Sequence, residues 1–219
     1  MLPYDSYKEI TRFISVVPEV FADSEIIGVY LGNEICASII HNADKLNRIR
    51  FYENLSVIDD SVKEKFISLY KDWESQIPNL NVLIKDGRNF DTNATFIYHD
   101  MDMSQIDFFK CYGSKLKGKL LANCGWGSNF TTTLHFTRMA MRRFIFPVAM
   151  YRDILFYVLD VTLYYELFNL FKERLELANI NHNIQHYDDN LAIIKIIEAP
   201  TYEELYKGYL INDDTSSRI

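Results

Sequence analysis

The stretch that decides the predicted fold is EIIGVYLGNEICASII, residues 25–40. Two runs rich in β-forming residues flank the pair Gly32-Asn33, and a two-residue turn of this kind is typical of a β-hairpin. Strands joined by so short a turn have to be antiparallel, because a parallel pair needs a long crossover connection. We therefore predict an antiparallel hairpin over this stretch.

Two later stretches show the same arrangement of strand, turn and strand. The predicted pairs cover residues 81–85 with 94–99, and residues 119–124 with 130–136. Residues 191–197 are apolar at nearly every position, which predicts a central strand buried on both faces. Together these patterns predict an α+β fold in which helices pack on a mainly antiparallel sheet of about six or seven strands.

Helical spacing of apolar residues marks most of the remaining chain. The predicted helices cover residues 4–21, 61–73, about 151–179 and 201–209. Asp5 is the expected N-cap of the first helix, and Ser61 with Glu64 forms a capping-box pattern at the start of the second. The apolar run 144–171 predicts a core helix. Charged residues interrupt this run, and they exclude a membrane span.

The domain organisation is predicted to be simple. No linker, repeat or low-complexity tract divides the 219 residues, so we expect a single α+β domain over residues 1–210 and a polar tail over residues 211–219. The three cysteines form no C-x-x-C pair, and the first residues lack the features of a secretory signal. These features predict a cytoplasmic protein with reduced, buried thiols and no contact with a membrane.

The charge balance bears on the class of partner. The chain has 23 Lys and Arg against 30 Asp and Glu, a net charge of -7. This balance disfavours nucleic acid as a partner, since a polyanion is repelled by an acidic surface. It favours a basic protein partner, although solubility alone also accounts for such a charge.

Acidic residues stand next to aromatic residues at several predicted loops. The set that we expect to bind a partner is Asp59, Asp60, Tyr98, Asp100, Asp102, Tyr187, Asp188 and Asp189. Carboxylates raise the rate of association with a basic surface, and aromatic side chains supply binding energy. Our leading hypothesis is a non-enzymatic acidic binding protein of the immunity or antitoxin type, which occludes a basic toxin such as a nuclease. Asp residues favoured by turn geometry are the alternative explanation.

The alternative function is a small hydrolase or a two-histidine phosphoesterase. His135-Phe136-Thr137 matches the His-x-Thr element of that class, in which His acts as acid or base and Thr binds phosphate. His41 is the best candidate for the second histidine, although the residue two places on is Ala43, which has no hydroxyl group. The catalytic residues would then be His135, Thr137 and His41.

Three arginines form the main basic cluster, and they could bind a small anion: Arg138, Arg142 and Arg143. His99 with Asp102 could hold a divalent metal, but a convincing site would need more ligands, so we predict no metal. The sequence contains no Gly-x-Gly-x-x-Gly, Walker or Gly-x-Ser-x-Gly motif, and we predict no cofactor. The oligomeric state stays open.

Overall fold

The computed structural model describes residues 7–28, 34–85, 89–100, 111–124, 145–152, 154–188 and 191–197. The strands within these residues are β1 (Asp23–Gly28), β2 (Arg48–Glu53), β3 (Leu80–Ile84), β4 (Phe96–Asp100), β5 (Leu120–Cys124), β6 (Phe146–Tyr151), β7 (Ile154–Val158), β8 (His182–Asp188) and β9 (Leu191–Ile196). The α-helices are α1 (Lys8–Val16), α2 (Glu34–His41), α3 (Asp60–Gln76) and α6 (Val161–Leu177). Short 3-10 turns cover Pro18–Phe21, Ala43–Lys45, Leu55–Val57 and Gly113–Lys115.

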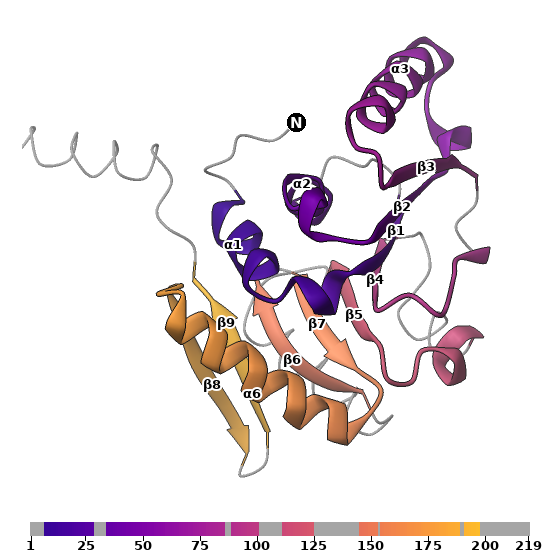
Figure 1. Ribbon diagram of the computed structural model, residues 1–219. Coiled ribbons are helices and arrows are strands. Elements are labelled where there is room, and N and C mark those ends of the chain that lie inside the picture. Colours follow the sequence, from indigo (N-terminus) through magenta and orange to yellow (C-terminus); the bar gives the residue numbers. More distant parts are fainter. Residues whose placement is uncertain are drawn as a thin grey trace, which may run out of the picture.

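The nine strands form one sheet in the order β3-β2-β1-β4-β5-β7-β6-β9-β8 (Figure 1). The pairs β3-β2, β2-β1, β1-β4, β4-β5 and β6-β9 are parallel, whereas β7 and β8 are antiparallel to their neighbours. The prediction of an α+β fold with a mainly antiparallel sheet is therefore wrong. The chain has a mostly parallel α/β sheet in which β1 lies between β2 and β4.

The first predicted hairpin is replaced by a strand and a helix. Residues 23–28 form β1, but the second apolar run forms α2, which ends at His41. Four of its apolar side chains are buried: Ile35, Cys36, Ala37 and Ile39. A short continuous apolar run fits a buried helix as well as a buried strand, so the sequence pattern alone could not distinguish them.

The second predicted hairpin contains real strands that do not pair. Residues 80–84 form β3 and residues 96–100 form β4, and β2 and β1 lie between them in the sheet. In the third predicted hairpin, residues 120–124 form β5, and residues 130–136 lie outside the described residues. These errors concern the partner of each strand, which local sequence does not encode.

The predicted helix over about residues 151–179 is correct only in its second half. Its first part belongs to the hairpin of β6 and β7, which turns at Arg152 with φ 50°. The helix α6 begins at Val161, where the side chain of Asp160 accepts a hydrogen bond from the backbone N–H of Thr162 at 2.9 Å. Both strands are buried along most of their length. Strands buried on both faces do not alternate between polar and apolar residues, which explains why this apolar run looked helical.

Other expectations are confirmed. The helix over residues 8–16, the helix α3 and the strand β9 all occur where the patterns place them. The N-cap of α3 is Asp59 in place of the predicted Ser61. The predicted cap Asp5 and the predicted segments 201–209 and 211–219 lie outside the described residues. No helix within the described ranges has the length and apolar character that a bilayer crossing requires.

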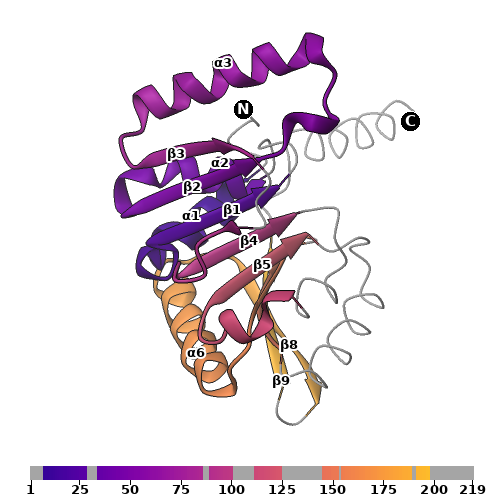
Figure 2. The same cartoon turned by 90° about the vertical axis from the view of Figure 1, so that its right-hand side faces the viewer.

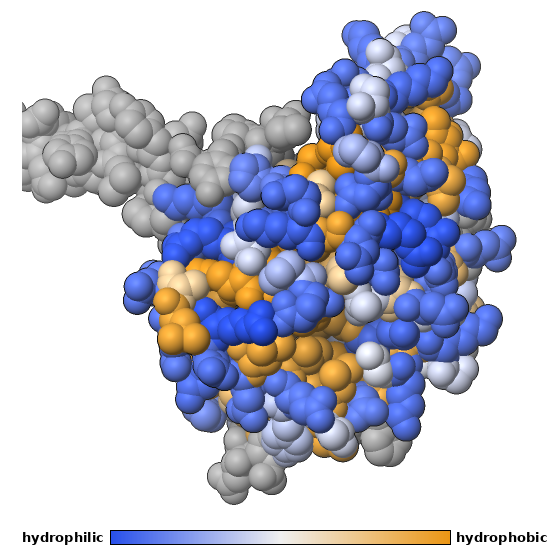
Figure 3. Space-filling model, viewed as in Figure 1, coloured by the Kyte–Doolittle hydropathy of each residue, from blue (hydrophilic) through white to orange (hydrophobic). Residues whose placement is uncertain are grey.

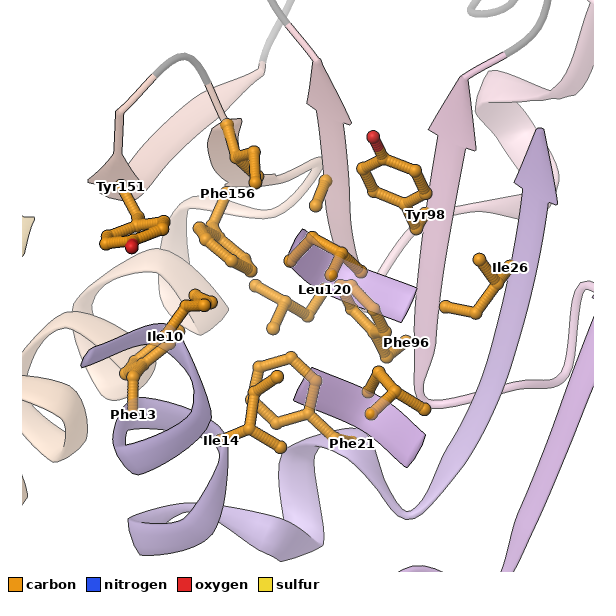
Figure 4. Close-up of a cluster of buried hydrophobic side chains, with 14 of the residues drawn as sticks. Ile10, Phe13, Ile14, Phe21, Ile26, Phe96, Tyr98, Leu120, Tyr151 and Phe156 are labelled. Carbon is orange, nitrogen blue, oxygen red and sulfur yellow. The ribbon is translucent and has the colours of Figure 1, made fainter. Parts of the chain in front are cut away.

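Apolar side chains cover both faces of the sheet. The larger cluster joins one face to α1, α2, α3 and α6, and Figure 2 shows α1 and α6 together on that side. Phe13 of α1 packs edge-on against Phe156 of β7, with ring centroids 5.3 Å apart (Figure 4). It also packs edge-on against Phe171 of α6, at 4.9 Å. The smaller cluster on the other face includes Phe90 and Tyr157.

Two arginines connect α1 to α6 at the carboxyl ends of both helices. Arg12 of α1 donates to the backbone oxygen of Ala178 at 2.6 Å, just beyond α6. Arg174 of α6 donates to the backbone oxygen of Val16 at 2.9 Å, at the end of α1. Each helix thus receives a cation at its negative end, where terminal carbonyl groups have no partner within the helix.

Candidate functional site

The order of the strands points to one edge of the sheet. The chain passes from β1 through β2 to β3 on one side of β1, and β4 and β5 follow on the other side (Figure 1). Connections therefore leave β1 and β4 in opposite directions at their carboxyl ends. In open α/β sheets, ligands bind outside the carboxyl ends of the strands at such a reversal. The side chains at this edge are therefore the candidates for binding a ligand.

Three strand ends form one row at this edge. The register aligns Gly28, the last residue of β1, with Glu53 of β2 on one side and with Asp100 of β4 on the other. Gly28 is buried and has no side chain, so no Cβ stands between the two acidic residues at this end of β1. The row combines the features that a polar ligand with hydroxyl groups needs.

Glu53 is fully buried, with an exposed fraction of 0%. Its Oε2 accepts a hydrogen bond of 3.0 Å from the hydroxyl group of Tyr70 on α3. Burying a carboxylate costs free energy unless hydrogen bonds or opposite charges compensate. A buried carboxylate at a strand end on the ligand-binding edge is therefore a candidate for function. Because Glu53 is covered, a ligand can reach it only after the residues that cover it have moved.

His99 precedes Asp100 on β4, and the register aligns it with Ile27 of β1. It is 1% exposed, and burial lowers the pKa of its imidazole from 6.5 to about 4. The ring is therefore neutral at pH 7, where it can donate or accept a hydrogen bond but carries no charge. Successive residues of a strand point to opposite faces, so His99 and Tyr98 face opposite sides of the sheet.

A network of charged side chains lies away from this edge, near the amino ends of β1 and β2. Arg50 forms ion pairs with the buried Glu25 and, at 2.9 Å, with Asp91. Arg48 forms an ion pair of 3.0 Å with the same Asp91. These pairs hold the segment before β4 against the sheet. Because opposite charges meet directly, we interpret the network as structural.

The expected partner-binding residues do not form one surface. Tyr98 is buried in the larger apolar cluster. Asp59 caps α3, and Asp60 is paired with Lys63 of the same helix. Tyr187 is partly buried on β8, at the opposite edge of the sheet from β3. Asp100 and Asp188 stand at the ends of β4 and β8, and Asp102 and Asp189 lie outside the described part of the chain.

The aromatic residues are concentrated in the core. Among the described residues, the largest fully buried side chains are all Tyr or Phe, and the one exposed large aromatic is Tyr165, at 49%. Figure 3 shows mainly hydrophilic side chains on the face that carries α1, α2 and α6. The hypothesis of an acidic, aromatic surface that covers a basic toxin is therefore not supported by the described residues.

Of the predicted catalytic residues, the structure describes His41 alone. His41 is exposed at the end of α2, whereas the hypothesis requires a strand to present it. His135, Thr137, Arg138, Arg142 and Arg143 lie outside the described residues. Cys36 is buried as expected, but Cys111 is exposed. No group of three or more His, Cys, Asp or Glu that could hold a metal occurs among the residues that the structure describes.

No protein-family model and no curated protein matches this sequence. Solved structures resemble the fold distantly. They include a methyltransferase from Geobacter sulfurreducens, with 17% identity, 68% of this chain and 78% of that chain covered, and a TM-score of 0.45. Human methyltransferase-like protein 13 in complex with SAH has 13% identity, covers 84% and 96% of the two chains, and has a TM-score of 0.44. Spermidine synthase in complex with the transition-state analogue AdoDATO has 14% identity, coverages of 84% and 69%, and a TM-score of 0.45.

Both functional hypotheses from the sequence are wrong, because the described residues form a mostly parallel α/β sheet with a buried aromatic core and place His41 at the end of a helix. The solved structures named above are two methyltransferases and a spermidine synthase, each with a TM-score below 0.5. The α/β sheet, the buried aromatic residues and the position of His41 explain why the patterns misled. A likeness at this level concerns the fold and assigns no activity to this chain.

Glu53 was missed because no strand is predicted at residues 48–53. A signal for it exists in the sequence. Gly28 lies within a β-rich run, and an acidic residue, Glu53, follows it by about 25 residues. In nucleotide-binding α/β folds, an acidic residue about 20 residues beyond the glycine turn binds the ribose.

Proposed function

We propose that this chain binds a phosphate-free nucleoside cofactor of the S-adenosylmethionine class at the carboxyl edge of the sheet, and that it transfers a group from this cofactor to an acceptor. The observation that carries the proposal is the row of Glu53 and Gly28 beside the point where the strand order reverses. Function is argued here from that site, because one fold can support many activities.

The acidic residue fits a ribose. A carboxylate accepts hydrogen bonds only, and the two adjacent hydroxyl groups of a ribose can donate to it. Glu53 stands at the end of the strand next to β1, which is where dinucleotide-binding folds place the carboxylate that binds the ribose. The buried carboxylate of Glu53 therefore fits this part of the cofactor.

The glycine pattern argues against a dinucleotide. Pyrophosphate binding uses Gly-x-Gly-x-x-Gly, in which the second glycine lets the backbone approach the phosphates. Residues 28–33 read GVYLGN, which has two glycines at the wrong spacing. A cofactor that has adenine and ribose but no phosphate satisfies the carboxylate without needing the missing glycines. When bound, S-adenosylmethionine supplies a carbon atom on a positively charged sulfur, and a nucleophile can attack that carbon.

Calorimetric titration with S-adenosylhomocysteine, a stable analogue, tests the proposal. We expect binding by the wild type and a loss of about tenfold to a hundredfold in affinity for Glu53→Gln, since a hydrogen bond to a charged group contributes about 1.5–3 kcal/mol. Glu173→Gln, an exposed carboxylate on α6, is the matched control and should leave the affinity unchanged. NAD should not bind.

Two results would contradict the proposal. One is a wild-type protein that is folded by circular dichroism and does not bind S-adenosylhomocysteine. The other is binding that Glu53→Gln leaves unchanged, because the ribose carboxylate would then have been assigned to the wrong residue.

A further inference from the structure

Tyr70 connects the helix α3 to the proposed ligand site. Its hydroxyl group donates to Oε2 of Glu53 at 3.0 Å, and its side chain is 2% exposed. Only Tyr70 and Trp73 of α3 are classed as buried. One of the two buried side chains of α3 therefore donates to the carboxylate that we assign to the ribose.

The ring of Tyr70 is held on two sides. The ring of Phe66 lies 5.9 Å away, and the ring of Trp73 lies 5.7 Å away, both measured between centroids. These neighbours are one turn before and about one turn after Tyr70 on the same helix, where side chains meet. Aromatic packing on both sides leaves the hydroxyl group little freedom to move.

The helix itself is held at the edge of the sheet. Oε1 of Glu74 accepts a hydrogen bond of 2.6 Å from the backbone N–H of Val82 on β3. Asp59 caps the start of α3 through the backbone N–H of Ser61, at 2.8 Å. The hydroxyl group of Tyr70 is thus placed by contacts along the helix, and it can fix the position of another side chain.

We propose that Tyr70 is a positioning residue that orients the carboxylate of Glu53 toward the two ribose hydroxyl groups, and that it thereby makes the site selective for ribose over deoxyribose. This inference rests on the proposed function. A glutamate carboxylate rotates about its last bond with little resistance. A hydrogen bond from a fixed donor selects one orientation, so less conformational entropy is lost when the ribose binds.

The test compares two ligands in three proteins by calorimetric titration. The ligands are S-adenosylhomocysteine and the analogue that lacks both ribose hydroxyl groups. The proteins are the wild type, Tyr70→Phe and the matched control Tyr164→Phe. Tyr164 is also buried, and its hydroxyl group donates to the backbone oxygen of Ala192 at 2.8 Å. The same hydroxyl group accepts a hydrogen bond from the backbone N–H of Ala192 at 3.2 Å, so the control removes two buried hydrogen bonds without touching Glu53.

We expect Tyr70→Phe to weaken the binding of S-adenosylhomocysteine about five- to tenfold, which corresponds to the loss of one hydrogen bond. The affinity for the dideoxy analogue should change less than about twofold, because this ligand has no ribose hydroxyl groups for Glu53 to bind. Tyr164→Phe should change neither affinity. Thermal unfolding should show a loss of stability in both variants, at least as large for Tyr164→Phe, which loses two hydrogen bonds to the backbone of Ala192. This pattern separates positioning from a general loosening of the fold.

Equal weakening of both ligands by Tyr70→Phe would overturn the inference, since it would indicate a purely structural role. Unchanged binding of S-adenosylhomocysteine would overturn it as well. A wild type that binds neither ligand would overturn the proposed function, and this inference with it. Wild-type binding that depends on Glu53 but is the same in Tyr70→Phe would overturn this inference alone.

Discussion

His99 makes the stability of this protein depend on pH in a way that can be calculated. The imidazole is 1% exposed, and its pKa is about 4 in the folded chain, because burial disfavours the charged form. In the unfolded chain the pKa returns to about 6.5. Between these values the unfolded chain binds more protons than the folded chain.

The sign and size of the effect follow from this difference. Stability rises with pH wherever the unfolded state holds more protons, so the contribution of His99 is complete above about pH 6.5 and is lost as the pH falls toward 4. The pKa difference corresponds to about 3 kcal/mol in the free energy of unfolding. About 2 kcal/mol of this should disappear between pH 7 and pH 5.

Urea denaturation followed by circular dichroism at a series of pH values measures the effect. Other groups titrate in the same range, so the wild type is compared with His99→Gln, which has no titrating ring. The pH dependence should be shallower in His99→Gln by about 2 kcal/mol between pH 7 and pH 5. His41→Gln, at an exposed histidine, is the control and should keep the wild-type dependence. Parallel stability curves for the wild type and His99→Gln would refute the reasoning.

Three further predictions concern packing and helix ends, and urea denaturation at pH 7 measures each. Arg174→Met removes the bond to the backbone oxygen of Val16 and the ion pair with Glu19, and it should cost about 1–2 kcal/mol, since the guanidinium group is partly exposed; no loss would show that these two contacts do not stabilise the fold. Asp160→Ala removes the N-cap of α6 and should cost about 1 kcal/mol; an unchanged value would mean that water replaces the cap. Phe156→Ala leaves a cavity in the core and should cost about 3–5 kcal/mol, whereas Tyr165→Ala, at an exposed ring, should stay within about 0.5 kcal/mol; similar losses for both would contradict the assigned core.

Local periodicity predicted several elements well. The helices at residues 8–16 and 60–76 have apolar residues on one face, and their positions are confirmed. The strand β9 is apolar at nearly every position, and it is buried along most of its length. In these segments the spacing of apolar residues follows from the local helix or strand alone, so the sequence was sufficient to predict the element.

The direction and pairing of the strands could not be predicted in the same way. A strand that is buried on both faces has no alternation of polar and apolar residues, so it resembles a buried helix. This explains both α2, which was predicted to be a strand, and the β6-β7 hairpin, which was predicted to be helical. The run Ile154–Val158 is rich in aromatic and β-branched residues, and this composition could have indicated a strand.

The candidate site arises from pairing across the sheet. Glu53 and Gly28 are far apart in the sequence, and the parallel register of β1 and β2 brings them into one row. The acidic pairs misled for a related reason. Their aromatic neighbours, such as Tyr98, were expected on the surface, but they fill the core of a large sheet. Burial depends on tertiary structure, which composition does not reveal.

A crystal structure of the chain with S-adenosylhomocysteine tests the central claim most directly. We predict that the ribose hydroxyl groups lie about 3 Å from the carboxylate of Glu53, outside the carboxyl ends of β1 and β2. A ligand bound elsewhere, for example beside Glu25 and Arg50 near the amino ends of the same strands, would contradict the account.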